Sequence, residues 1–312
     1  MNDVDSAHAL LAAACRQQIT SIREAQRRVL DSVASTGEGP ADKEAVHDFR
    51  VAVRRCRTML RWARLVWNTK RLSRIDKELG YFARTTGTLR DDEVLHDTLT
   101  SIPAFESAAD EVNSWLRMRT RTGKTRRRKV ARVVRDGPSL RESVSLSDKP
   151  IRDLAIVLDK LDRVLDTEPT TSWTTQALAV RAMEKSLRAV RRAASAQGDD
   201  TEAMHTLRIR EKRLRYSAEL FANELGKEGS RLVSHATRMQ RRLGELHDLD
   251  EAIATISRAR GLSLVTKGSI LADLRATRIA CAAKVEPLLN EARGLDAQIV
   301  LSCNESLPNS AT

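Results

Sequence analysis

Cationic side chains recur at every third or fourth position of residues 47–64, a spacing that lets them act together on one ligand. They are His47, Arg50, Arg54, Arg57, Arg61 and Arg64. At 3.6 residues per turn these steps bring them onto one helix face, at about one charge per 5 Å of axis. Arginine presents a planar fork of donors that matches phosphate oxygens. The stripe therefore predicts a surface that binds a polyanion.

A second segment repeats this order of cations further along the chain. A shift of 158 residues, the separation of His47 from His205, brings the first stripe onto the second. The second stripe consists of His205, Arg208, Lys212 and Arg215. Each histidine lies near an expected helix start, where unpaired N–H groups and the helix dipole favour an anion. We therefore expect both histidines to face the ligand.

Apolar side chains run beside both stripes. In the first half they step by three and four from Val46 to Trp67, which predicts a helix face packed into a core. The counterparts in the second half are apolar too, except that Glu211 replaces Val53. A shift of 157 brings Arg84 onto Arg241. These matches indicate two halves related by internal duplication.

A third basic stretch covers residues 112–135, which contain no aspartate or glutamate. The cations on one face of this stretch include Arg117, Arg121, Lys124 and Arg128. A solvated face usually mixes charge signs, because like charges four residues apart cost roughly 0.2–0.5 kcal/mol per pair. The unmixed face favours an anionic ligand, with simple solvation as the alternative.

The composition favours long helices and a polyanionic partner. Lysine and arginine number 54 against 42 acidic residues, a net charge of +12. Glycine (13) and proline (7) are scarce, and aromatic residues make up only 3%, which disfavours a β-rich fold. We therefore predict an all-α protein. Charge alone does not distinguish among nucleic acid, an anionic membrane surface and polyphosphate as the partner.

The periodicity divides the chain into two helical halves. We expect helices at about 4–35, 42–68, 72–100, 104–135, 151–166, 170–197, 201–226, 228–260 and 264–293. The predicted domains are an N-terminal bundle at 1–140, a linker at 141–150, a C-terminal bundle at 151–295 and a flexible tail at 296–312.

No apolar run approaches the roughly 18 residues of a membrane span, and the N-terminus does not resemble a signal peptide. Four widely separated cysteines fit reduced thiols, so we expect a cytoplasmic protein without a membrane span.

Two segments resemble the signature of the CHAD family, the conserved-histidine α-helical domain. They are Val46-His47-Asp48-Phe49-Arg50-Val51-Ala52-Val53-Arg54-Arg55-Cys56-Arg57 and Met204-His205-Thr206-Leu207-Arg208-Ile209-Arg210-Glu211-Lys212-Arg213-Leu214-Arg215-Tyr216. Leu89-Arg90-Asp91 and Leu243-Gly244-Glu245-Leu246-His247-Asp248 resemble the short motifs of the family's following helix. The resemblance covers about residues 5–295, nearly the whole chain.

The resemblance implies two four-helix bundles related by a pseudo-twofold axis around a basic central groove or pore. It also implies binding of inorganic polyphosphate and association with polyphosphate granules. The ligand-facing residues carried over by position are His47, Arg50, Arg54, Arg57, Arg61, His205, Arg208, Lys212 and Arg215, with Arg84 and Arg241 added. Glu219 departs from the pattern, because it replaces the cation found at Arg61. Either the second half grips a shorter stretch of ligand, or Glu219 pairs with a neighbouring arginine.

Two other functions stay open beside polyphosphate binding. The first is non-sequence-specific binding of nucleic acid, for which the tryptophans, four in number, are few if bases must be stacked. The second is metal-dependent hydrolysis of phosphoanhydrides. Its best carboxylate clusters are Asp91, Asp92 and Glu93 with His96, and Asp248, Asp250 and Glu251 with His247. Carboxylates beside arginines more often orient those arginines, so we expect a protein with no catalytic residue, metal or cofactor.

Overall fold

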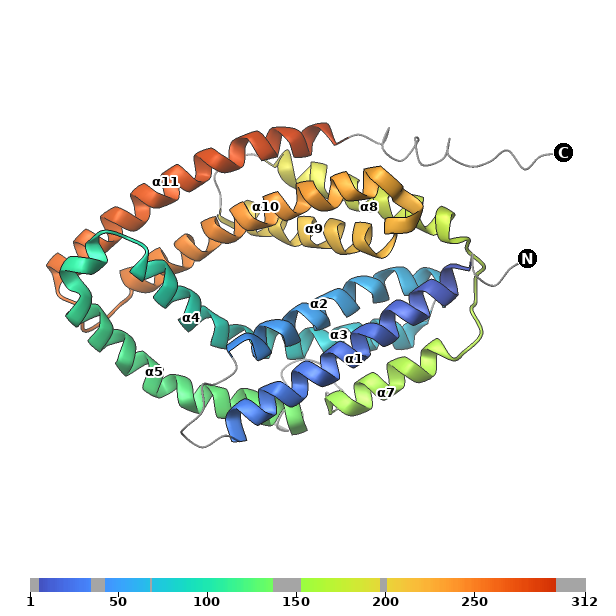
Figure 1. Ribbon diagram of the computed structural model, residues 1–312, viewed down its shortest axis with the longest axis horizontal. Coiled ribbons are helices and arrows are strands. Elements are labelled where there is room, and N and C mark those ends of the chain that lie inside the picture. Colours follow the sequence, from blue (N-terminus) through green and yellow to red (C-terminus); the bar gives the residue numbers. More distant parts are fainter. Residues whose placement is uncertain (1–5, 35–42, 68, 137–152, 197–200, 296–312) are drawn as a thin grey trace. The chain divides into compact units, whose positions relative to one another are not determined.

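The computed structural model describes residues 6–34, 43–67, 69–136, 153–196 and 201–295, most of which are helical (Figure 1). These ranges contain no strand, and their single isolated β-bridge joins Ser6 to Thr174. The predicted all-α class is therefore confirmed. No helix in the same ranges has both the length and the hydropathy needed to cross a membrane.

The chain divides into two compact units. Unit 1 comprises residues 1–93 and 117–174, and unit 2 comprises residues 94–116 and 175–312. This division differs from the predicted bundles at 1–140 and 151–295. Residues 154–165 pack with N-terminal helices, and residues 94–116 join the C-terminal core, because tertiary packing overrides order along the chain. The predicted linker at 141–150 and tail at 296–312 lie outside the described residues.

Unit 1 is built on four helices whose apolar faces meet. They are α1 (Ala7–Ala34), α2 (Lys43–Val66), α3 (Lys70–Thr85) and α7 (Leu154–Leu165). Packing joins α1 to α2, α2 to α3, and α3 to α7 (Figure 1). The predicted apolar stripe of α2 is confirmed, because Phe49, Val53, Cys56, Leu60 and Trp67 are all fully buried. This burial removes the apolar face of α2 from water. The polar side of the helix stays outside the core.

The predicted single helix at 72–100 is wrong, because the structure has two helices there. One is α3, which ends at Thr85, and the other is α4 (Gly87–Thr100). Between them, the hydroxyl of Thr86 donates to the carbonyl oxygen of Phe82 at 2.9 Å. This local bond competes with the backbone hydrogen bonds that would continue the helix. No proline marks the break in the sequence. The next helix, α5, spans Ala104–Asp136.

Unit 2 is formed by four further helices and by residues 94–116. The helices are α8 (Thr175–Ala194), α9 (Thr201–Leu220), α10 (Ala222–Ser257) and α11 (Leu264–Gly294). One core cluster joins Leu99 and Trp115 to Ile256 and Leu274. Within α10 the backbone kinks at Gly226, whose φ of +51° lies in the region that favours glycine. The predicted break at 227 falls beside this kink, but α9 ends at Leu220, six residues before the end predicted for it.

Candidate functional site

The cations of the first stripe lie on α2 and form what we call the N-terminal basic face. It consists of His47, Arg50, Arg54, Arg57 and Arg61. His47 is exposed and the four arginines are half-buried. The helix that the spacing predicted is therefore present, with its cations on the side that the buried stripe leaves open.

Arg50 reaches from α2 to the end of α3. Its Nη1 donates to the carbonyl oxygen of Thr86 at 3.2 Å. The last carbonyls of a helix lack intrahelical donors and carry the negative end of the helix dipole, so a guanidinium is favoured there. One donor of Arg50 thus fixes α3 against α2, and the side chain is held in place on the basic face.

Arg57 is oriented by two features of α3. Its Nε donates to Oδ1 of Asp76 at 2.7 Å, and Nη1 of Arg64 lies 4.0 Å from Oδ2 of the same carboxylate. The guanidinium lies over Gly80, where an added Cβ would come within 3.0 Å of Cζ of Arg57. Asp76 therefore offsets part of the charge of the face, and the missing side chain at Gly80 makes room for the arginine.

Arg54 differs from its neighbours on α2. Within the part of the chain that the structure describes, its side chain has no carboxylate or carbonyl partner. It is half-buried and lies about one helical turn from both Arg50 and Arg57, whose guanidinium groups are bound by α3. Among the α2 arginines it is the one best prepared to bind an external anion.

The second stripe lies on α9 and forms the C-terminal basic face. It consists of His205, Arg208, Lys212 and Arg215. The His205 ring lies beside that of His247 on α10, with 5.5 Å between ring centroids. Packing of α9 on α10 thus brings one more imidazole to the predicted cations. We did not predict His247 as a binding residue, although it aligns with Arg90 when the second half is shifted by 157 residues.

His247 reports the electrostatic potential of the C-terminal basic face. Burial, followed by the positive charges of Arg208, His205 and Lys212, lowers the pKa of His247 to about 4. At neutral pH the ring is therefore uncharged, and the three neighbours are close enough to repel its proton. This arrangement is costly without a counter-charge and favours an anion at this place.

The guanidinium group of Arg215 is bound by neighbouring side chains of unit 2. Its Nε donates to Oε1 of Glu219 at 2.7 Å, and its Nη1 donates to Oε1 of Gln240 at 3.0 Å. Of the two explanations that the sequence left open for Glu219, pairing with a neighbouring arginine is therefore confirmed. The pair offsets the positive charge at the end of the C-terminal basic face.

The remaining predicted cations belong to other helices. Arg84 lies exposed near the end of α3, Arg117 lies exposed on α5, and Arg241 lies exposed on α10. The side chains of Arg121, Lys124 and Arg128 lie outside the described residues. These six cations stay predictions, and the described geometry concerns the basic face of α2 in unit 1 and, separately, that of α9 in unit 2.

The polar exception in the apolar stripe, Glu211, is fully buried against His235. Nε2 of His235 lies 3.4 Å from Oε1 of Glu211, and Nδ1 lies 3.1 Å from Oε1 of Glu291. Burial lowers the pKa of His235, but its interactions with Glu211 and Glu291 outweigh that effect and leave the pKa raised. Glu211 is thus part of a buried ion pair that joins α9 to α10.

The carboxylates considered for metal-dependent hydrolysis are not gathered at a cation site in the described regions. Asp250 accepts a bond of 2.5 Å from Nε of Arg278, so this carboxylate orients an arginine. No group of three or more His, Cys, Asp or Glu side chains in those regions could hold a metal ion. Asp91, Asp92 and Glu93 lie outside the described side chains.

Comparison with known proteins decides the family. Residues 13–257 match the CHAD domain. The chain belongs to the CHAD family. The matched segment contains both the N-terminal and the C-terminal basic face of this CHAD protein.

Solved structures show the same fold. The CHAD domain from the plant Ricinus communis is 20% identical over 98% of this chain and 94% of that chain, with a TM-score of 0.63. PptA from Streptomyces chartreusis is 16% identical over 92% of this chain and 99% of that chain, with a TM-score of 0.64. No curated protein has significant similarity to the sequence.

Proposed function

We propose that this CHAD protein binds inorganic polyphosphate without acting as an enzyme, through the N-terminal and C-terminal basic faces. The observation that carries the proposal is the cluster of His205, Arg208 and Lys212 around His247, whose pKa these charges help to lower. Polyphosphate supplies about one negative charge per phosphoryl unit and several acceptor oxygens. Its phosphate oxygens can therefore accept from several of these cations at once, and its charge is opposite to theirs.

Unit 1 supports the same ligand with a different arrangement. Arg50 and Arg57 are held by α3, and Arg54 lies between them with its donors unused among the described residues. Arginines that are fixed before binding lose less conformational entropy when a phosphate arrives. The groove shared by the two halves stays a prediction, as does association with polyphosphate granules in the cytoplasm.

Nucleic acid is the competing ligand for the same charges. Three tryptophans, Trp62, Trp67 and Trp115, are at most 5% exposed, so they are not available as stacking platforms for bases. Recognition of a duplex through its backbone phosphates is therefore the alternative to be tested. Duplex DNA therefore belongs in the binding experiment as a competitor.

The experiment is a salt-titrated binding assay on the full chain with long-chain polyphosphate, inorganic triphosphate and duplex DNA. We expect polyphosphate to bind most tightly, with an affinity that falls steeply with salt because bound counterions are released. The double variant Arg54→Glu with Lys212→Glu should lose at least about 100-fold in affinity. Lys77→Glu with Lys227→Glu, at exposed positions outside both faces, is the charge-matched control. Equal binding by both double variants, or tighter binding of DNA at equal phosphate concentration, would contradict the proposal.

A further inference from the structure

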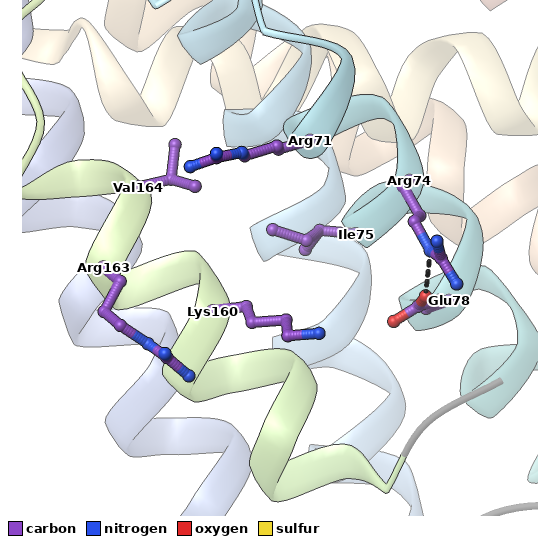
Figure 2. A pocket seen from close by; sticks show the side chains of 7 residues that line it. All are labelled: Arg71, Arg74, Ile75, Glu78, Lys160, Arg163 and Val164. Carbon is purple, nitrogen blue, oxygen red and sulfur yellow. Dashed lines mark hydrogen bonds and ion pairs between the residues drawn. The ribbon is translucent and has the colours of Figure 1, made fainter.

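A separate basic cavity lies within unit 1, between α3 and α7. Its volume is about 350 Å³, and it is lined by Arg71, Arg74, Ile75 and Glu78 of α3 with Lys160, Arg163 and Val164 of α7 (Figure 2). Four cations and one carboxylate give the lining a net formal charge of +3. None of these residues belongs to either basic face described above.

The positive charge of the cavity follows from how α7 distributes its charges. The acidic residues of α7 are used by α1, because Asp159 pairs with Arg23 at 2.7 Å and Asp162 pairs with Arg16 at 3.0 Å. The cations Lys160 and Arg163 line the cavity beside α3 instead. The carboxylates that could neutralise them are thus engaged on another face of the same helix.

Two cations extend across the cavity and form no ion pair with any residue in the described ranges. Figure 2 shows Arg71 reaching from α3 toward Val164, and Lys160 reaching from α7 toward α3. Neither has an ion-pair partner among the described residues. The carboxylate of Glu78 is already used, since it accepts from Nε of Arg74 at 2.8 Å. The cavity therefore brings together donors for an anion that the unit itself does not supply.

The apolar part of the lining separates this cavity from a polymer site. Ile75 and Val164 are at most 4% exposed and line the cavity together with these cations. Apolar surface contributes nothing to a phosphate but favours an uncharged organic group. The volume is at the lower end of the roughly 300–1,000 Å³ of small-molecule sites. A small ligand with an anionic and an apolar part fits these features better than a polymer does.

We propose that this cavity binds a small organic diphosphate of the nucleoside diphosphate class, a ligand independent of the polyphosphate proposed above. Such a molecule carries about three negative charges at neutral pH, which matches the charge of the lining. Arg71, Lys160 and Arg163 hold the two phosphates by charge-assisted hydrogen bonds. The uncharged part of the ligand packs on Ile75 and Val164.

The test is calorimetric titration of the full chain with ADP, and with pyrophosphate and adenosine as the two halves of that ligand. We expect ADP to bind more tightly than either half. Arg71→Ala and Lys160→Ala should each weaken ADP binding by at least about tenfold. Lys77→Ala, an exposed cation on the same helix but outside the lining, is the matched control and should bind ADP like the unaltered protein.

Glu78→Gln sharpens the test, because it removes the negative charge from the lining while keeping a side chain of the same shape. It should bind ADP more tightly by several-fold, whereas a general loss of folding would weaken binding. Polyphosphate affinity should be unchanged in Arg71→Ala, and ADP affinity should be unchanged in Arg54→Glu. No ADP binding, or equal binding by Arg71→Ala and Lys77→Ala, would overturn the site. Displacement of ADP by pyrophosphate at equal affinity would overturn the organic part of the ligand.

Discussion

The two basic faces share one pattern of cations in the sequence but differ at their far ends. On α2 the cations continue past Arg57 to Arg61, whereas on α9 the corresponding position holds Glu219, which binds Arg215 at 2.7 Å. The N-terminal basic face is therefore longer, and the C-terminal basic face concentrates its charge around His247. The start of the motif is alike in both segments, and local ion pairs set how much of each face can bind an anion.

The cores beneath the two faces differ as well. Val53 in unit 1 is a simple apolar contact, and its counterpart Glu211 forms a buried ion pair with His235. Under the shift of 157 residues, His235 corresponds to Glu78, which is paired with Arg74. Each unit thus carries a buried polar residue at a matching position of the sequence, paired with a different partner. A buried charge is tolerated only when such a partner is present.

The largest effect is expected from breaking the buried pair of unit 2. Glu211→Leu leaves His235 buried without its main partner and should destabilise the protein by about 3 kcal/mol at pH 6. Because the pKa of His235 is raised by folding, its contribution is fully present below its unfolded value and is lost as pH rises through the folded value. Denaturant unfolding should therefore give a smaller difference from the unaltered protein at pH 9 than at pH 6.

The double variant Glu211→Leu with His235→Leu is the control for this effect. It removes both charges and restores an apolar contact like that of Val53, so most of the lost stability should return. A double variant as unstable as Glu211→Leu alone would show that the ion pair is not the cause.

The second largest effect is expected from reversing one charge on each basic face. Arg54→Glu should weaken polyphosphate binding by about 30-fold, and Lys212→Glu by about tenfold, because the longer N-terminal basic face makes more contacts with the ligand. Fluorescence anisotropy with labelled polyphosphate would measure both losses at one salt concentration. A larger loss from Lys212→Glu would reverse the proposed order of the two faces.

A smaller effect should follow from lengthening the short face. Glu219→Arg restores the cation of Arg61 and releases Arg215 from its ion pair. We expect a gain of about three- to tenfold in polyphosphate affinity and a steeper salt dependence, by roughly one more neutralised charge. Unchanged affinity and salt slope would show that the ligand does not extend to this end of α9.

The smallest effect is expected from disturbing one arginine without removing charge. Gly80→Ala places a Cβ 3.0 Å from the guanidinium carbon of Arg57, so the arginine must move away from its bond to Asp76. An alanine in a helix interior usually stabilises by about 1 kcal/mol over glycine, and this clash should offset the gain. Polyphosphate affinity should fall about threefold with little change in Tm. Unaltered affinity would mean that the orientation of Arg57 is unimportant.

Local features of the fold could be predicted from the sequence. Steps of three and four predicted α1, α2, α5 and α11 nearly to their ends, because the apolar face that makes each helix also buries it. The break at Thr86 was missed, since one hydroxyl bond to Phe82 carries no periodic signal. The assignment of α7 to unit 1 was missed too, because its partners on α1 are about 140 residues away in the sequence, as in the 136-residue separation of Arg23 from Asp159.

In the candidate site, too, local features could be predicted and contacts between distant residues could not. Residues that share one helix, such as His47 and Arg54, could be grouped from spacing alone. Partners from another helix could not: Asp76 beneath Arg57, and His247 beside His205, are brought there by packing between helices. The sequence therefore predicts where cations gather, and only the fold tells which of them are already neutralised.

The most direct test of the account is the pKa of His247 measured by NMR with and without polyphosphate. In the free protein the pKa should be about 4, because burial and the charges of Arg208, His205 and Lys212 lower it. An anion bound to those cations should reverse their effect and raise the pKa above about 5. A pKa that stays the same when the protein is saturated with polyphosphate would contradict binding at the C-terminal basic face.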